Sequence, residues 1–183
     1  IVQGCDKFCT FCVIPYRRGR ETSKPLQQIS DEINQLVLNG AKEVTLLGQN
    51  VDSYGHDLNP KKDLSDLMHS IHDISELQRI RFLTSHPNDM SIKLINTINE
   101  LPKVCKCINL PFQAGSNRIL ANMRRGYTRD QFLRKIDQIR QIIPDVTLTT
   151  DLIVGFPGET DQDFNDSIEL LNIVNFDKVH VAA

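Results

Sequence analysis

Several features are missing from this sequence of 183 residues, and each absence removes a class of protein. No apolar run approaches the ~20 residues that a helix needs to cross a bilayer. There is no excess of positive charge, because 21 Lys and Arg residues stand against 23 Asp and Glu residues, for a net charge of -2. A protein that binds nucleic acid through its overall charge is strongly basic. Any RNA binding would therefore depend on a local patch or on another domain.

A disulfide framework and a targeting segment are also missing. The five cysteines are an odd number, in a chain without a signal peptide, which argues against a secreted disulfide-rich domain. We therefore expect reduced thiols and a cytoplasmic protein that has no membrane partner. The length suits one domain. Because the sequence opens without Met and ends inside an expected strand, we expect it to be a fragment of a longer protein.

Three of the cysteines, Cys5, Cys9 and Cys12, lie together in the segment GCDKFCTFCVIPYRRGRE. No fourth Cys or His follows at zinc-site spacing, so a zinc site, which takes four ligands, would need one from elsewhere. Thiolates also suit iron–sulfur clusters. With three protein ligands, one iron of a [4Fe-4S] cluster stays open to a small molecule. Ordinary burial is the remaining alternative, and the polar residues of the loop argue against it.

Along the chain, short apolar runs alternate with segments of helical spacing. The expected strands are 1–4, 43–48, 79–84, 104–110, 146–154 and 178–182. The expected helices are 27–39, 63–74, 92–98, 116–124, 129–142 and one that begins after Thr160. This last helix is predicted to carry a capping-box variant completed by Asp163, and to bury Phe164, Ile168, Leu171 and Val174.

Near-continuous apolar strands, each followed by an amphipathic helix, indicate a parallel sheet covered by helices. Six such units predict an incomplete (β/α) barrel. In such barrels active sites gather at the C-terminal ends of the strands. Five segments fall at those ends: the cysteine loop, GQN at 48–50, SHP at 85–87, PFQAGS at 111–116 and GFPGE at 155–159. The sequence therefore predicts one shared active face.

Five motifs carry a resemblance to a known family: GCDKFCTFCVIPYRRGRE, EVTLLGQNVDSYG, LPFQAGSNRIL, RRGYT and DLIVGFPGET. Nearly end to end, the chain resembles the radical S-adenosylmethionine (SAM) superfamily, and within it the methylthiotransferases that act on tRNA. The fold class implied is α/β, a radical SAM partial (β/α)6 TIM-like barrel truncated at both ends. Residues 1–183 would form the core domain. The N-terminal methylthiotransferase domain, with a second [4Fe-4S] cluster, and the C-terminal TRAM domain are expected outside these residues.

The resemblance also implies a set of cofactor sites. Cys5, Cys9 and Cys12 would hold a [4Fe-4S] cluster, and SAM would chelate its fourth iron. The segment 48–50 would face the SAM amino group, Gln113 the ribose or the substrate, and the loop 155–158 the adenine. The cofactor-binding residues implied are Gly48, Gln49, Asn50, Gln113, Gly155 and Gly158. No residue is assigned as a catalytic acid or base.

The activity implied is reductive cleavage of SAM, followed by addition of a 2-methylthio group to N6-isopentenyl-adenosine next to the tRNA anticodon. The partners implied are the tRNA anticodon loop and an electron donor such as flavodoxin or ferredoxin. Two alternatives within the enzyme class are a methylthiotransferase for N6-threonylcarbamoyl-adenosine in tRNA and one for a ribosomal protein aspartate. GQNV at 48–51 favours the isopentenyl-adenosine enzyme over the ribosomal one. A non-catalytic, metal-stabilised RNA-binding module is the alternative from another class. Without the second cluster, we expect these residues alone not to complete sulfur transfer.

A few further residues have no assigned ligand. His86 suits a proton carrier or a structural hydrogen bond. Cys105 and Cys107 alternate along an expected strand, so both face the same side, and we predict that they are packing residues or spare thiols. Two basic segments, 17–24 and 124–134, are predicted to be solvated faces or to contact RNA phosphates.

Overall fold

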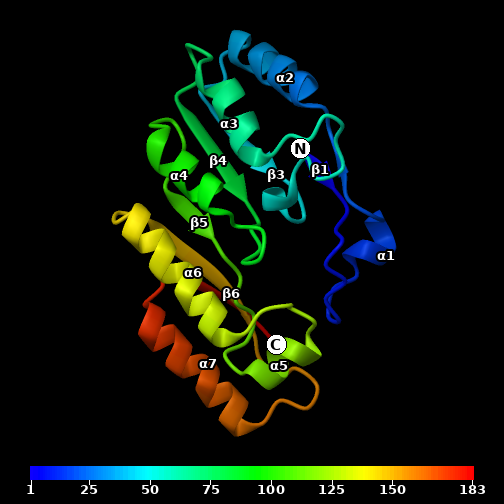
Figure 1. Cartoon of the computed structure of the whole chain (residues 1–183), viewed down its shortest axis with the longest axis vertical. Helices are drawn as coiled ribbons and strands as arrows, with labels where there is room; N and C mark the ends of the chain where they lie inside the picture. The colour runs from blue at the N-terminus through cyan, green and yellow to red at the C-terminus, as the bar shows by residue number, and fades with distance from the viewer.

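The computed structural model describes the whole chain, residues 1–183, as an open sheet of mostly parallel strands with helices packed along it (Figure 1). The elements in chain order are β1 (Val2–Gln3), α1 (Ile14–Arg18), β2 (Thr22–Ser23), α2 (Leu26–Leu38), β3 (Glu43–Leu47), η1 (Val51–Ser53), α3 (Leu64–His72), β4 (Arg79–Leu83), α4 (Ile92–Glu100), β5 (Cys107–Asn109), α5 (Asn117–Asn122), α6 (Arg129–Ile142), β6 (Thr147–Ile153), α7 (Asp161–Val174) and β7 (Lys178–Ala182). The predicted α/β class and the alternation of strand and helix are confirmed.

The main strands follow one another in chain order, as in a barrel. β3 pairs in parallel with β4, and β5, β6 and β7 form a second parallel group. A parallel bridge between Ile80 and Val104 joins the two groups. Residues 1–4 were predicted as a strand of the same series, but β1 pairs antiparallel with β2. The amino group of Ile1 donates to the carbonyl of Leu47 at 2.9 Å, which places the start of the chain beside β3.

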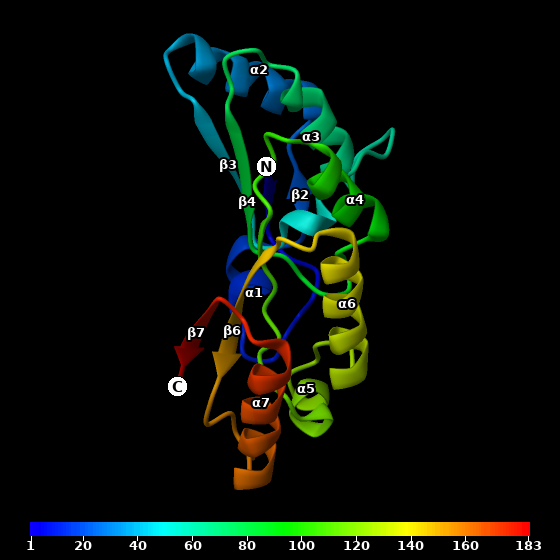
Figure 2. The same ribbon diagram turned by 90° about the vertical axis from the view of Figure 1, so that its left-hand side faces the viewer.

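The sheet is buried on one face only. Val44 and Leu46 in β3 are buried, whereas their neighbours Glu43, Thr45 and Leu47 are exposed, and β4 alternates in the same way. The predicted cover of helices is therefore present on one face of the sheet, and the near-continuous apolar runs do not reflect burial of every strand residue. Figure 2 gives the reason, since α3, α4 and α6 lie on one side of the strands. We call the opposite, water-facing side of the sheet the inner face. It is polar in part, with Glu43 accepting hydrogen bonds from two arginines of β4.

Local signals in the sequence account for most of the helix ends. Capping boxes begin α3, α6 and α7, so side chains satisfy amide groups that no helical carbonyl reaches. α2 ends in a Schellman motif at Gly40, where the amide of Ala41 donates to Leu36 O at 3.0 Å. None of the helices combines the length and the apolar character that crossing a bilayer requires.

The buried face of α7 differs from the predicted one. The helix buries Asp163, Ser167, Leu170 and Val174, while Phe164 and Ile168 are exposed. The reason is a polar contact with the loop 111–116: the Ser116 hydroxyl donates to Asp163, and Ser167 Oγ accepts from the amide of Gly115 at 2.8 Å. Hydrogen bonding to that loop thus outweighs apolar periodicity in orienting the first half of α7.

Candidate active site

A cavity of about 400 Å³ lies at the C-terminal ends of the strands. This volume falls within the range of ~300–1,000 Å³ typical of small-molecule sites. The lining residues are Cys5, Lys7, Cys9, Phe11, Cys12, Ile14, Gly48, Gln49, Asn50, Thr84, Ser85, His86, Pro111, Gln113 and Arg125. The predicted shared face is confirmed for four of the five loops. The fifth, at 155–159, does not line this cavity.

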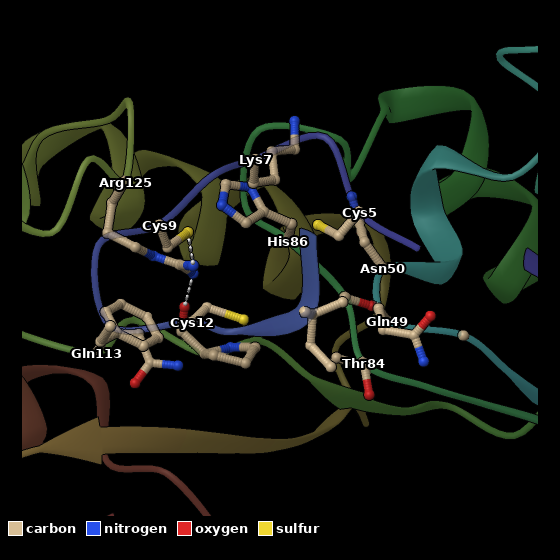
Figure 3. Close-up of a pocket in the computed structure, with 15 residues that line it drawn as sticks. Cys5, Lys7, Cys9, Cys12, Gln49, Asn50, Thr84, His86, Gln113 and Arg125 are labelled. Carbon is tan, nitrogen blue, oxygen red and sulfur yellow. Dashed lines mark hydrogen bonds between the residues drawn. The ribbon is translucent and has the colours of Figure 1, made fainter. Parts of the chain in front are cut away.

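The cysteine loop is held on a folded support. Thr10 anchors it, with its amide donating to Met123 O at 3.2 Å and its hydroxyl to Asn122 O at 2.9 Å, both at the C-terminal end of α5. Cys9 is buried, Cys5 and Cys12 are half-buried, and all three are free thiols. Figure 3 shows their side chains around one hollow. The fold therefore presents three sulfur ligands to a common space.

The arrangement of sulfur atoms fits a cluster better than a single ion. No three His, Cys, Asp or Glu side chains are placed to hold one metal ion. A mononuclear zinc site would need converging ligands and a fourth donor beyond the three cysteines. In a [4Fe-4S] cluster each cysteine binds a different iron, so the thiolates need not converge on a point. The donor set thus fits an iron–sulfur cluster.

The segment 48–50 has three distinct structural roles. A side chain at Gly48 would overlap Val2, so glycine there lets the end of β3 lie against β1. Gln49 Oε1 accepts a hydrogen bond from the amide of Gly4 at 2.8 Å, directly before the first cysteine. Asn50 Nδ2 donates to Asp89 Oδ2 at 2.6 Å. Gln49 therefore fixes the position of the cysteine loop, while Asn50 is oriented by Asp89.

Three cavity-lining residues carry buried polar atoms without a partner: Asn50 Oδ1, Gln113 Oε1 and His86 Nε2. Buried polar groups in native proteins are nearly always hydrogen-bonded, and each exception calls for an explanation such as a bound ligand or water. The amide oxygens can only accept hydrogen bonds. Asn50 and Gln113 thus line the cavity and each keep a buried acceptor that no group of the chain satisfies.

Backbone strain is concentrated at the same place. Five non-glycine residues have positive φ, and three of them belong to the cavity or the cysteine loop: Phe8 at 50°, Thr84 at 74° and Gln113 at 69°. Thr84 is the most unusual, because a β-branched residue is strongly disfavoured there. Such conformations cost about 1–3 kcal/mol each and cluster at functional sites.

His86 is a neutral residue of the cavity wall. Burial, and then the charges of Arg125 and Lys7, lower the pKa of His86 to about 3. Its Nδ1 accepts from the amide of Asn88 at 3.3 Å, and its ring meets Tyr127 edge-on at 5.8 Å. Of the two predicted roles, the structural hydrogen bond is the one observed.

Asp52 is a buried carboxyl that the sequence analysis missed. It accepts from the hydroxyl of Ser85 at 3.0 Å and from the amide of His86 at 3.2 Å. Burial raises the pKa of Asp52 to about 7. Its place at the start of η1, directly after the GQN motif, was the one available signal. The carboxyl supports the loop after β4 from below the cavity.

This carboxyl predicts a pH dependence of stability. Because the folded-state pKa of Asp52 lies above the unfolded value, the folded protein retains a proton that the unfolded chain releases. The stabilisation that this proton gives the folded protein is fully present below about pH 4 and is lost as pH rises through 7. We expect the unfolding free energy of the wild type, relative to Asp52→Asn, to fall by up to about 4 kcal/mol between pH 4 and pH 8. Urea unfolding of both proteins across this range measures it, and parallel pH profiles would contradict it.

The two basic segments are only partly solvated faces. Arg125 is buried, with 6% of its surface exposed, so the prediction of a solvated or RNA-contacting residue is wrong at this position. In the other segment Arg20 is paired with Asp6 at 2.6 Å and Lys24 with Glu32 at 2.8 Å. Arg17 and Arg18 remain exposed without an ion pair.

The loop at 155–159 is held by local hydrogen bonds. Gly155 and Gly158 adopt φ values of 72° and 84°, with open space where a side chain would project. Glu159 accepts a hydrogen bond from the amide of Phe156 at 3.1 Å, and Arg118 donates to Gly158 O at 2.7 Å. The predicted contact of both glycines with a cofactor stays a prediction.

Sequence comparison identifies the family. The model of the radical SAM superfamily matches residues 1–171. The chain belongs to the radical SAM superfamily. This match covers the cysteine loop and every loop that lines the cavity, so the predicted fold class agrees with the family.

The curated relatives with high sequence identity share one name. The chain is 55% identical over its whole length to the tRNA-2-methylthio-N(6)-dimethylallyladenosine synthase of Dehalococcoides mccartyi, and covers 44% of that protein. It is 53% identical over 98% of its length to the enzyme of the same name from Herpetosiphon aurantiacus, and covers 41% of it. The chain thus spans less than half the length of these relatives.

Solved radical SAM structures share the fold at low sequence identity. The methyltransferase TsrM from Kitasatospora setae, with cobalamin and a [4Fe-4S] cluster bound, matches 99% of this chain and 35% of its own, with a TM-score of 0.79 and 17% identity. The cobalamin-dependent radical enzyme OxsB, with aqua-cobalamin and SAM bound, matches 93% of this chain and 25% of its own, with a TM-score of 0.72 and 13% identity. At these identities the likeness supports the fold alone.

Proposed function

We propose that this chain is the radical SAM core of a tRNA methylthiotransferase that adds a 2-methylthio group to N6-isopentenyl-adenosine, also called dimethylallyladenosine. The observation that carries the proposal is one cavity lined by three free cysteines and by two residues, Asn50 and Gln113, that carry unpartnered amide oxygens. The curated relatives at 53–55% identity support the choice of substrate. The alternatives that act on N6-threonylcarbamoyl-adenosine or on a ribosomal protein have no comparable support.

The residues present suit a cluster and SAM in this cavity. Cys5, Cys9 and Cys12 would hold a [4Fe-4S] cluster with one open iron. A bound cluster would supply the one-electron reduction by which radical SAM chemistry cleaves SAM. Rotation of the Asn50 and Gln113 side chains would expose their unpartnered amide oxygens, which would then accept hydrogen bonds from the amino and hydroxyl groups of SAM. The buried walls of the cavity would exclude water from the radical.

The substrate would enter from the inner face of the sheet. An anticodon-loop adenosine is already single-stranded, so presenting it to the cavity needs no opening of a duplex. The exposed Arg17 and Arg18 follow the cysteine loop directly and would contact phosphates. A flavodoxin- or ferredoxin-type donor in the cytoplasm would supply the electron. Residues 1–183 would form the core domain, with the methylthiotransferase and TRAM domains elsewhere in the protein.

Anaerobic reconstitution tests the proposal. The protein would be loaded with iron and sulfide, reduced with dithionite in the presence of SAM, and analysed by chromatography for 5′-deoxyadenosine. We expect about four irons for each chain of residues 1–183, and formation of product. A colourless protein with stoichiometric zinc and no product would instead favour the RNA-binding module. Methylthiolation of isopentenyl-adenosine-containing tRNA by the intact protein tests the substrate.

Gln113 offers a prediction about cofactor affinity. Replacement by Ala removes an acceptor that has no partner within the chain, so we expect folding to be little affected and SAM binding to weaken by about tenfold. Isothermal titration of SAM into the reconstituted protein measures the change. Gln138→Ala, at an exposed position of α6, is the control. Unchanged affinity in Gln113→Ala would remove this residue from the proposed SAM site.

A further inference from the structure

Arg125 is a buried cation at the wall of the cavity. It lies between α5 and α6 with 6% of its surface exposed. Its guanidinium makes three contacts: Nη1 with Cys9 Sγ at 3.5 Å, Nη2 with Pro111 O at 2.9 Å and Nε with the hydroxyl of Tyr127 at 3.1 Å. Figure 3 shows the side chain reaching across the cavity wall to the sulfur of Cys9. The guanidinium thus bridges a cysteine and the loop after β5.

No carboxylate neutralises this charge. Arg125 forms no ion pair, and Asp89, on the loop after β4, is engaged by Lys7 at 2.7 Å. A buried ion without a counter-charge is strongly unfavourable. Pro111 O is a neutral dipole, and burial raises the pKa of Tyr127, which keeps its hydroxyl neutral. Among the groups that contact Arg125, only the sulfur of Cys9 becomes an anion in the metal-bound state.

The guanidinium is also held rigidly. The Tyr127 hydroxyl donates to Phe112 O at 2.9 Å and so fixes the oxygen that receives Arg125 Nε. The amide of Arg125 donates to Leu120 O at 3.0 Å. The cysteine loop is tied to this same region through Thr10. The positive charge and the Cys9 sulfur therefore keep a fixed separation.

We propose that Arg125 is a positioning residue that supplies a fixed positive charge to the Cys9 corner of the iron–sulfur cluster and thereby favours its reduced form. This inference rests on the proposed function. Reduction adds one electron, taken from dithionite in the test below, and the more negative cluster gains more from a nearby cation. Net charge and hydrogen bonds to the sulfurs are established determinants of cluster potential. The planar, permanently charged guanidinium suits this task better than a mobile ammonium.

An EPR-monitored redox titration of the reconstituted protein tests the proposal. Arg125→Met removes the charge, Arg125→Lys keeps it, and Arg124→Met is the matched control at the exposed neighbouring position. At the potential where half the wild-type clusters are reduced, we expect the ratio of reduced to oxidised cluster to fall about tenfold in Arg125→Met, which is about 59 mV for one electron. Arg125→Lys should recover most of the ratio, and Arg124→Met should match the wild type.

Each outcome decides the question. An Arg125→Met protein with a full cluster and the wild-type potential would overturn the proposal. If Arg125→Met binds no cluster, Arg125→Lys decides: a cluster retained there supports the charge role, and a cluster lost there contradicts it. If the wild type forms a cluster and 5′-deoxyadenosine, a failed potential shift refutes only the role of Arg125. If the wild type binds no cluster, the proposed function itself fails.

Discussion

Replacement of Cys5, Cys9 or Cys12 by Ala is expected to abolish both the cluster and the formation of 5′-deoxyadenosine. The three thiols line one cavity, and two sulfur ligands leave a second iron without a protein anchor. Loss of an outer partner of a metal ligand typically lowers activity 10–100-fold, so loss of a ligand should exceed about 100-fold. Iron and sulfide analysis together with chromatography of the reaction mixture measures both effects.

The chain contains its own control for this experiment. Cys105 and Cys107 are also free and half-buried, but they lie at β5 and line no part of the cavity. Their replacement by Ala should leave the iron content and the product unchanged. A cluster that survives Cys9→Ala, or one that is lost in Cys107→Ala, would show that the ligands have been assigned wrongly.

Replacement of Gly115 by Ala is expected to destabilise the fold by about 3 kcal/mol or more, at the upper end of the range for overpacking. A side chain at this position would overlap backbone atoms of Asp166 and Ser167 in α7, which cannot rotate away. The loop would separate from α7 and carry Gln113 out of the cavity wall. Urea unfolding of the metal-free protein measures the loss, and SAM affinity should fall with it.

Gly40→Ala is the control for Gly115→Ala, because the two positions differ in the space available to a side chain. Gly40 has a φ of 96°, and no atom lies within 4 Å of the position that a side chain would take. Gly40→Ala should therefore cost only the backbone strain, about 1–2 kcal/mol. A smaller loss in Gly115→Ala than in Gly40→Ala would mean that α7 shifts readily and that its contact with the loop is loose.

Much of the fold could be predicted because local patterns determine it. α6 was predicted with its observed ends, 129–142, since its apolar residues recur at helical spacing and a proline follows it. α7 shows where such reasoning stops. Its apolar spacing pointed to Phe164 and Ile168, but hydrogen bonds from Ser116 and Gly115 turn Asp163 and Ser167 inward. Those partners are about fifty residues away in sequence, so periodicity within the helix contains no trace of them.

The candidate site was predictable to the same degree. The cysteine spacing and the positions of the loops correctly predicted four of the segments that line the cavity, because parallel strands place their C-terminal ends together. Arg125 was missed, since in sequence it belongs to a run of basic residues, and only tertiary packing separates it from the exposed Arg124. Asp52 was missed for a related reason, because nothing local distinguishes a buried carboxyl from an exposed one.

The water-facing inner surface of the sheet has an evolutionary consequence. Side chains such as Thr45 and Leu83 project from the strands without belonging to the hydrophobic core. Their substitution leaves the packing between sheet and helices intact, and surface changes of this kind typically alter stability by less than about 0.5 kcal/mol. Selection can therefore change which molecule is accommodated beside the cavity while the scaffold and its cysteines stay the same. New substrate specificities would arise through substitutions of the exposed strand residues, without changes in the hydrophobic core.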